Sequence, residues 1–176
     1  MQHENLKNIK AFAFDVDGVF TDGGVFCDVE GQLLRTFDAK DGFGVRMAIM
    51  NGYKVAIITG GNSASIRHRF KGSRIPPEDI YLGSRDKYSD LVRFCEKYDL
   101  QPSEVLYIGD DIPDIEVIMA VGIGLCPSDA ATEVKAAADV VSDFPGGKGC
   151  VRDAVESVLK AQGKWEFDKY LYKRLY

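Results

Sequence analysis

The sequence is poor in the residues that build zinc sites and disulfide frameworks. It has two histidines, His3 and His68, so a metal centre with histidine ligands is not indicated. Its four cysteines are widely spaced and form no CxxC pair, which argues against a structural zinc site and against disulfide bonding. We expect buried thiols at all four positions: Cys27, Cys95, Cys126 and Cys150.

Long apolar segments are also absent. No apolar run approaches the length that spans a bilayer, so we expect no membrane partner. The first ten residues, MQHENLKNIK, lack the apolar core of a secretory signal, which predicts a cytoplasmic protein. The net charge of -5 disfavours nucleic acid as a partner but is compatible with a local basic pocket, so we expect a small anionic molecule instead.

Short β-rich runs alternate with segments of helical period, which indicates an α/β protein. The length of 176 residues favours one compact domain, and we place it at residues 1–162. Apolar runs typical of parallel strands covered on both faces lie at 10–16, 53–59, 79–82, 105–109, 122–125 and 139–141. Apolar residues at helical spacing predict helices that include 88–95 and 151–159.

Two segments depart from this alternation. GGVFCDVEGQLLRTFD, at 23–38, has two β-prone runs around DVEG and predicts a β-hairpin inserted after the first strand. The last segment, 163–176, is rich in aromatic residues amid charges. Because aromatic anchors are typical of protein interfaces, we expect this tail to dock on a neighbouring subunit. A short helix packed on its own domain is the alternative.

Polar residues follow the predicted strands at their carboxyl ends. In open parallel sheets, ligands bind beyond these ends, so we expect the residues to form one site. Clustered carboxylates need a cation, and an oxygen-rich set suits Mg²⁺. The residues are Asp15 and Asp17 after the first strand, Thr59, Gly60 and Gly61 after the second, Lys87 after the third, and Asp110, Asp111 and Asp114 in GDDIPD after the fourth.

The two aspartates of DVDG indicate two-step phosphoryl transfer. One carboxylate attacks phosphorus to form an aspartyl-phosphate, and the other protonates the leaving alcohol and then activates water. Thr59 and backbone N–H groups would bind the phosphoryl oxygens, Lys87 would offset negative charge, and Asp110 would anchor the metal. Taken alone, DVDG is equally compatible with a solvated turn and Lys87 with a surface lysine. The complete ordered set favours catalysis.

In this order, DVDGVFTDGG, IITGG, Lys87 and YIGDDIPD resemble the four motifs of the haloacid dehalogenase superfamily of phosphatases. The resemblance covers nearly the whole chain. It implies a Rossmann-like parallel sheet flanked by helices. It also implies that Asp15 is the nucleophile and a Mg²⁺ ligand and that Asp17 is the general acid/base and binds the metal through its backbone carbonyl. Asp110 is then the third protein ligand, and Asp111 and Asp114 are supporting residues.

Within the superfamily, a closer resemblance is to the 3-deoxy-D-manno-octulosonate 8-phosphate phosphatases, which are sugar-acid phosphatases of lipopolysaccharide synthesis. It is carried by DGFGVRMA, GDDIPD, GGKGCVRDAVESVLKAQGKW and the lack of a cap-domain insertion, so we expect a capless fold. The resemblance implies a homotetramer in which the hairpin of one subunit covers the active site of its neighbour. It also implies substrate contacts from Arg69 and from Lys148 in the GGKG loop. A solvated helix face for Arg69 and a flexible loop for Lys148 are the alternatives.

Gly61 departs from the family pattern. Octulosonate phosphatases often have Arg directly after the Thr-Gly pair, whereas a related nonulosonate 9-phosphate phosphatase has Glu. A nine-carbon sugar acid 9-phosphate is therefore the alternative substrate.

Two functions without turnover also use parts of this pattern. A phosphorylatable receiver domain shares the strand-end Asp, Mg²⁺, Thr and Lys, but a second carboxylate at Asp17 and a long hairpin argue against it. A catalytically silent oligomerisation domain is the other possibility, and the presence of the whole set of acidic and basic site residues argues against it.

Overall fold

The structure is a computed structural model, and it describes residues 1–166. Its centre is a six-stranded sheet in the order β5-β4-β1-β6-β7-β8, in which every pairing is parallel. The strands lie within two residues of their predicted bounds. They are β1 (Ala11–Phe14), β4 (Lys54–Thr59), β5 (Ile80–Leu82), β6 (Val105–Ile108), β7 (Ile123–Cys126) and β8 (Val140–Val141).

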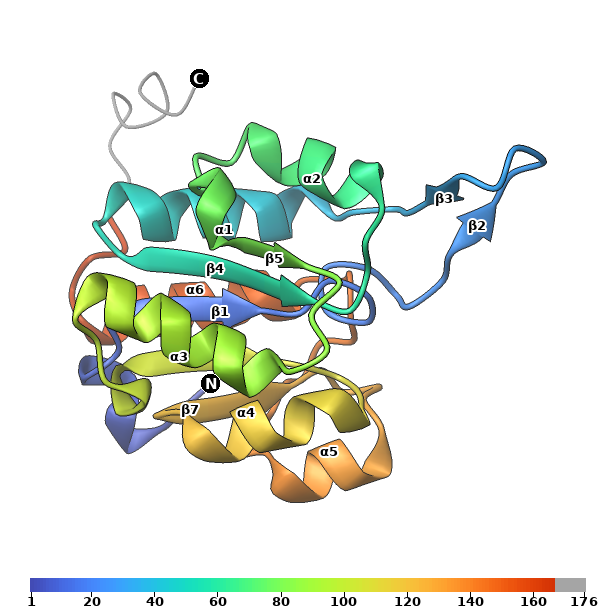
Figure 1. The fold of residues 1–176 in the computed structure, drawn as a ribbon. Helices are drawn as coiled ribbons and strands as arrows, with labels where there is room; N and C mark the ends of the chain where they lie inside the picture. The colour runs from blue at the N-terminus through green and yellow to red at the C-terminus, as the bar shows by residue number, and fades with distance from the viewer. Residues whose placement is uncertain (167–176) are drawn as a thin grey trace.

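Helices cover both faces of this sheet, which confirms the predicted α/β, Rossmann-like class (Figure 1). The α-helices are α1 (Ala39–Met50), α2 (Ala64–Lys71), α3 (Lys87–Tyr98), α4 (Ile115–Ala120), α5 (Thr132–Ala137) and α6 (Cys150–Ala161). Short 3-10 helices are η1 (Glu4–Lys7), η2 (Pro77–Asp79), η3 (Pro102–Glu104) and η4 (Ile112–Asp114). Among the described residues, none of the helices is long and apolar enough to cross a membrane.

Strand β1 shows how the two faces are packed. Its sequence is AFAF, and all of its residues are fully buried. Phe12 and Phe14 pack in the cluster that includes α1 and α6, whereas Ala11 and Ala13 face the cluster that includes α3 and α4. Ala13 pairs in register with Tyr107 of β6, so a small side chain stands beside a large one on the same face. This packing fixes β1, and with it the position of Asp15.

A two-stranded hairpin follows β1 and extends away from the body of the protein (Figure 1). It consists of β2 (Phe26–Cys27) and β3 (Leu33–Leu34), which pair antiparallel. At its turn, the Asp28 carboxylate accepts hydrogen bonds from Glu30 N and Gln32 N at 3.0 and 2.8 Å. The hairpin lies at the end of the sheet where β1 and β4 terminate.

The hairpin corrects one prediction. Cys27 is exposed, whereas Cys95, Cys126 and Cys150 are buried as expected. A two-stranded hairpin has no second layer within its own subunit, so its apolar positions stay open to solvent. The predicted tail, 163–176, lies mostly outside the described residues. At its start, Trp165 is partly buried, with the Arg152 guanidinium 4.8 Å from the ring centroid.

Candidate active site

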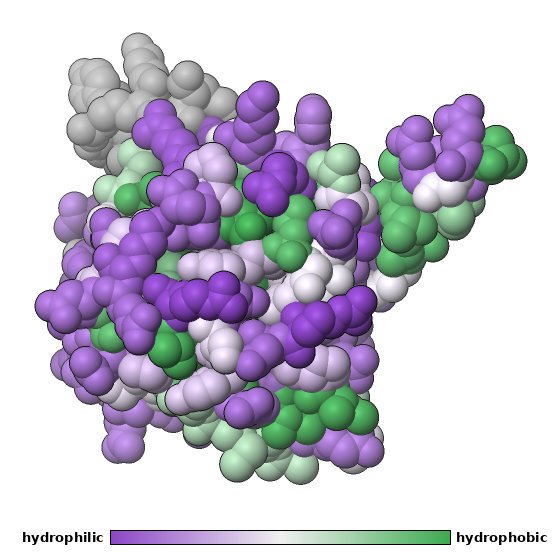
Figure 2. Space-filling view, in the orientation of Figure 1, coloured by the Kyte–Doolittle hydropathy of each residue, from purple (hydrophilic) through white to green (hydrophobic). Residues whose placement is uncertain are grey.

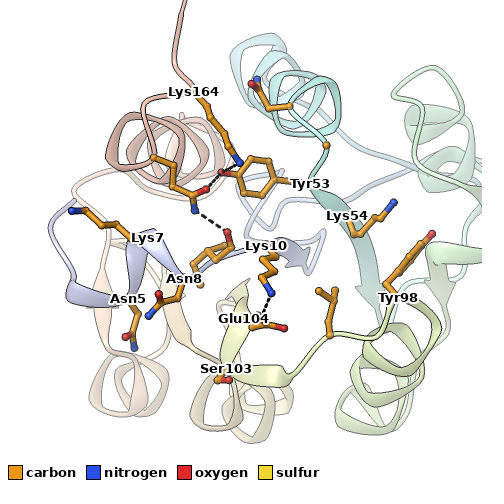
Figure 3. Close-up of a pocket in the computed structure, with 15 residues that line it drawn as sticks. Asn5, Lys7, Asn8, Lys10, Tyr53, Lys54, Tyr98, Ser103, Glu104 and Lys164 are labelled. Carbon is orange, nitrogen blue, oxygen red and sulfur yellow. Dashed lines mark hydrogen bonds and ion pairs between the residues drawn. The ribbon is translucent and has the colours of Figure 1, made fainter.

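A pocket of about 420 Å³ lies at the carboxyl edge of the sheet. The strand ends bring most of the predicted site residues into its wall: Asp15, Asp17, Thr59, Gly60, Gly61, Lys87, Asp110, Asp111 and Asp114. A larger cavity of about 830 Å³ lies at the opposite end of the strands and is lined by lysines, asparagines and tyrosines (Figure 3). Its Glu104 is paired with Lys10. The smaller pocket is the candidate active site, because the predicted site residues line it and do not line the larger cavity.

A buried ammonium group in the wall of the pocket joins two carboxylates. Lys87 Nζ lies 2.7 Å from Asp15 Oδ2 and 2.7 Å from Asp114 Oδ1. Burial alone would lower the pKa of Lys87, but the charges and hydrogen bonds of the two aspartates raise it above its usual value. Lys87 therefore remains a cation beside Asp15.

Asp114 is a fully buried anchor for this arrangement. Besides Lys87, its carboxylate accepts a hydrogen bond from Tyr107 Oη and weaker ones from the backbone N–H groups of Asp110 and Asp111, at 3.2 and 3.3 Å. It thus links β6, the loop that follows β6 and the first residue of α3. Sequence reasoning placed Asp114 near the site, and the structure shows what it holds in place.

Asp15 and Asp110 have the properties of metal ligands. Ligand atoms of Asp15, Asp110 and Asp114 lie within 4.8 Å of one another. Among the described residues, Asp110 Oδ1 is a buried oxygen that accepts no hydrogen bond. Burial, followed by repulsion from Asp15 and Asp114, raises the pKa of Asp110 to about 7. The pKa of Asp15 is also raised, by burial and by Asp114, against the opposing effect of Lys87. A hard divalent cation fits this oxygen set.

Gly18 allows the loop after β1 to approach Asp110. Its φ is +79°, and a Cβ at this position would lie 1.9 Å from Asp110 Oδ2. Any other residue would strain the backbone and displace the carboxylate.

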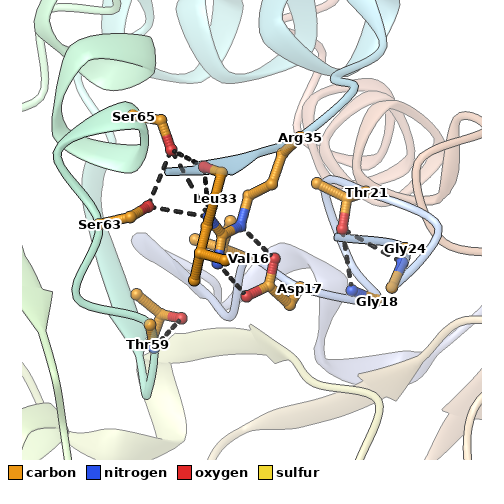
Figure 4. A network of polar contacts seen from close by, with 12 residues as sticks. Val16, Asp17, Gly18, Thr21, Gly24, Leu33, Arg35, Thr59, Ser63 and Ser65 are labelled. Carbon is orange, nitrogen blue, oxygen red and sulfur yellow. Dashed lines mark hydrogen bonds and ion pairs between the residues drawn. The ribbon is translucent and has the colours of Figure 1, made fainter. Parts of the chain in front are cut away.

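Asp17 is held by an arginine of the hairpin that sequence reasoning missed (Figure 4). Arg35, directly after β3, donates from Nε to Asp17 Oδ1 at 2.6 Å and from Nη2 to Oδ2 at 2.9 Å. Its Nη1 donates to Ser63 Oγ at 2.8 Å. The Arg35 side chain is only 3% exposed. Nothing in the sequence distinguished it from a solvated hairpin residue.

The β4–α2 connection forms another wall of the pocket. Thr59 is buried, and its Oγ1 accepts a hydrogen bond from Gly61 N at 3.2 Å. The Thr59 and Gly61 carbonyl oxygens accept bonds from Ser84 N and Gly83 N, both at 2.9 Å. The loops after β4 and β5 are therefore fixed to each other.

Comparison with known proteins identifies the family. A model of haloacid dehalogenase-like hydrolases matches residues 78–151. The 3-deoxy-D-manno-octulosonate 8-phosphate phosphatase KdsC of Escherichia coli K12 is 36% identical over 158 residues, which span 90% of this chain and 83% of that protein. The chain belongs to the KdsC family of haloacid dehalogenase-like hydrolases. The Haemophilus influenzae KdsC is 34% identical over 92% of this chain and 88% of its own length.

Solved structures of the KdsC family have the same fold. The Moraxella catarrhalis 3-deoxy-D-manno-octulosonate 8-phosphate phosphatase matches with a TM-score of 0.88 and 34% identity, over 97% of this chain and 96% of that chain. That structure is a complex with magnesium ion, phosphate ion and KDO. A cobalt-bound Haemophilus influenzae phosphatase matches with a TM-score of 0.89 and 32% identity, over 96% of this chain and 98% of that one. The family resemblance predicted from the motifs is confirmed.

Two residues that the KdsC resemblance implied as substrate contacts do not line the pocket. The Arg69 guanidinium lies 5.3 Å from the Phe37 ring centroid, and one of its nitrogens would lie 2.5 Å from a Cβ at Gly42. Lys148 is exposed on a loop whose Gly147 N donates to Val19 O at 2.9 Å. Their roles in binding substrate stay predictions.

The pocket also contains residues that sequence reasoning did not select. Ser84 and Arg85, in the loop between β5 and α3, both line it. They precede Lys87 closely, so a search of the residues around that motif could have found them. Their sequence neighbourhood alone did not show that both of them line the pocket.

Proposed function

We propose that this protein hydrolyses 3-deoxy-D-manno-octulosonate 8-phosphate to the free sugar acid and phosphate, in a Mg²⁺-dependent step of lipopolysaccharide precursor synthesis. The observation that carries the proposal is the joint placement of Asp15, Lys87 and the unpartnered Asp110 oxygen in one pocket. Membership of the KdsC family and the KDO bound to the Moraxella relative support the substrate.

In the first chemical step, the Asp15 carboxylate attacks phosphorus while the bond from phosphorus to the sugar oxygen breaks. For this step one Asp17 oxygen leaves Arg35 and carries a proton, which it gives to the departing alkoxide, so an aspartyl-phosphate and the free sugar acid result. In the second step, Asp17 takes a proton from water, whose oxygen attacks the same phosphorus. The bond between Asp15 and phosphorus breaks, which releases phosphate and restores both aspartates.

The remaining residues bind and neutralise the phosphoryl group. Lys87 keeps a positive charge beside Asp15, and Thr59 with the backbone N–H groups of Gly60 and Gly61 would contact the phosphoryl oxygens. Asp15, Asp110 and the Asp17 backbone carbonyl would hold Mg²⁺. When bound, the ion supplies charge neutralisation between these carboxylates and the phosphate.

We further propose that the protein is a cytoplasmic homotetramer whose hairpins cover neighbouring active sites. In support, exposed apolar side chains gather on the hairpin (Figure 2): Val25, Phe26, Val29, Leu33 and Leu34. A patch of this kind on a projecting element is typical of a protein interface. The tail after Gly163 would dock on an adjacent subunit. An unchanged sedimentation mass together with an unchanged KM, after removal of residues 164–176, would contradict the role of the tail.

Phosphate release in the presence of Mg²⁺ tests the substrate. The panel consists of octulosonate 8-phosphate, nonulosonate 9-phosphate and common hexose phosphates, with Asp15→Asn as the inactive control. We expect the highest kcat/KM for the eight-carbon acid. A higher kcat/KM for the nine-carbon acid would identify that acid as the substrate. Gly61, the departure from the family pattern, would then be the first residue to test as its cause. If the protein hydrolyses none of these esters, a phosphorylatable receiver domain or a silent oligomerisation domain becomes the favoured function.

A further inference from the structure

The pocket has far more acidic than basic groups in its wall. Its carboxylates come from Asp15, Asp17, Asp110, Asp111 and Asp114, and its basic side chains are Arg85 and Lys87. Lys87 is already bonded to Asp15 and Asp114, and the hairpin residue Arg35 is bonded to Asp17. Mg²⁺ would offset part of this charge between Asp15 and Asp110, and a ligand with a second negative charge, away from its phosphate, needs a further cation in the wall.

Arg85 is the basic side chain that remains available in this wall. It is exposed, and within residues 1–166 it takes part in no hydrogen bond, ion pair or ring contact. The acidic residues that follow Arg85 in the sequence are bonded to serines and not to Arg85. Asp86 accepts bonds from Ser89 N and Ser89 Oγ at 2.9 and 2.7 Å, and Asp90 accepts one from Ser84 Oγ at 2.5 Å. The Arg85 charge is therefore not neutralised locally.

The backbone around Arg85 is held firmly in place. Ser84 N donates to Thr59 O and Gly83 N donates to Gly61 O, so the residues before Arg85 are joined to the proposed phosphate-binding loop. On the other side, the Asp86 side chain caps the start of α3. A fixed backbone with a free guanidinium is a preorganised anion contact, because little backbone order is lost when the ligand binds.

We infer that Arg85 binds the carboxylate of the sugar-acid substrate and makes the enzyme prefer phosphate esters that carry this second anion. The inference rests on the proposed function. With the phosphate at Asp15, Arg85 is the basic side chain of the wall that is left for a second anion. The planar guanidinium presents paired N–H donors that match a carboxylate. Arg69 and Lys148 do not line the pocket, so they do not compete for this role in the single subunit.

The test compares two substrates in three variants. Octulosonate 8-phosphate carries the carboxylate, and p-nitrophenyl phosphate does not. For Arg85→Gln we expect KM for the sugar acid to rise about tenfold or more, with kcat nearly unchanged, because a charge-assisted bond is lost. For p-nitrophenyl phosphate we expect kcat/KM to stay the same. Arg85→Lys should restore part of the affinity. Arg67→Gln, which removes an equal charge from the exposed face of α2, should leave both substrates unaffected.

Two results would overturn the inference while the proposed function stands. One is an unchanged KM of Arg85→Gln for the sugar acid, and the other is an equal loss of kcat/KM on both substrates. The second result would assign Arg85 to the phosphoryl group or to folding. If the wild-type enzyme fails to hydrolyse octulosonate 8-phosphate, the proposed function and this inference are both overturned.

Discussion

At the residue scale, the site is dominated by carboxylates whose charges are unfavourable without a cation. Burial and repulsion raise the pKa of Asp110 from 3.8 to about 7. A raised pKa in the folded state means that the folded protein binds this proton more tightly than the unfolded chain does. The stabilising contribution of this group is therefore complete below about pH 4 and is lost as the pH rises toward 7.

This linkage predicts that stabilisation by Mg²⁺ depends on pH. At pH near 8 the ion binds ionised carboxylates, whereas near pH 5.5 it must displace protons from Asp110 and Asp15. We expect 5 to 10 mM Mg²⁺, about the concentration that saturates a millimolar site, to raise the midpoint of thermal unfolding more at the higher pH. Scanning fluorimetry at both pH values measures this, with Asp110→Asn as the control that loses the response. An equal shift at both pH values would be evidence against the metal site.

Asp114 provides a second prediction at this scale. Asp114→Asn removes the charge that Lys87 and Tyr107 face in a fully buried position, so Lys87 keeps Asp15 as its one acidic partner in this network. We expect a loss of about 3 kcal/mol in the free energy of unfolding, which is typical of a broken buried pair. Urea unfolding measures it. Asp111→Asn, on an exposed residue of the same loop, is the matched control and should cost less than about 0.5 kcal/mol.

At the scale of elements, the base of the hairpin and the active site are one connected unit. Arg35 joins the return strand to Asp17 and to Ser63, and Ser65 Oγ donates to Leu33 O at 3.0 Å (Figure 4). The network therefore links three segments: the loop after β1, the end of β3 and the start of α2. A change in the hairpin position would be transmitted to the proposed general acid/base.

Arg35→Met tests this connection. The variant keeps much of the side-chain length but loses the guanidinium N–H groups that orient the Asp17 carboxylate. We expect kcat to fall at least about tenfold, since positioned acid–base catalysis contributes considerably more than that. Backbone amides near Leu33 should also exchange faster with deuterium. Arg93→Met, which removes an arginine paired with Asp90 on the surface of α3, is the control. An unchanged kcat together with unchanged exchange would refute the connection.

The elements also show what the sequence could and could not predict. Continuous apolar runs predicted all six strands of the parallel sheet, because strands covered on both faces have no polar side. The residues at their ends were then brought together by the parallel topology alone. Arg35 could not be predicted in the same way, since its contact with Asp17 depends on where the hairpin folds back. The prediction that Cys27 is buried was wrong, because the sequence does not show that the hairpin projects away from the body of the protein.

At the scale of the whole molecule, the exposed hairpin is the part of the surface on which the proposed assembly depends. Phe26 is 67% exposed at the centre of the projecting element. We expect Phe26→Glu to reduce the sedimentation mass, because a buried charge would disrupt an apolar contact between subunits. Glu30→Gln, at the tip of the same hairpin, is the control. Retention of the wild-type mass by Phe26→Glu would show that the hairpin does not assemble subunits in the proposed way.

In the proposed mechanism, the phosphoryl group is transferred in two steps through Asp15. The most direct test is the stereochemical course at phosphorus, measured with a substrate ester made chiral by sulfur and oxygen isotopes and hydrolysed in isotopically labelled water. Two successive in-line displacements each invert the centre, so we predict net retention of configuration. Net inversion would mean that water attacks the substrate directly, and it would contradict the assignment of Asp15 as the nucleophile.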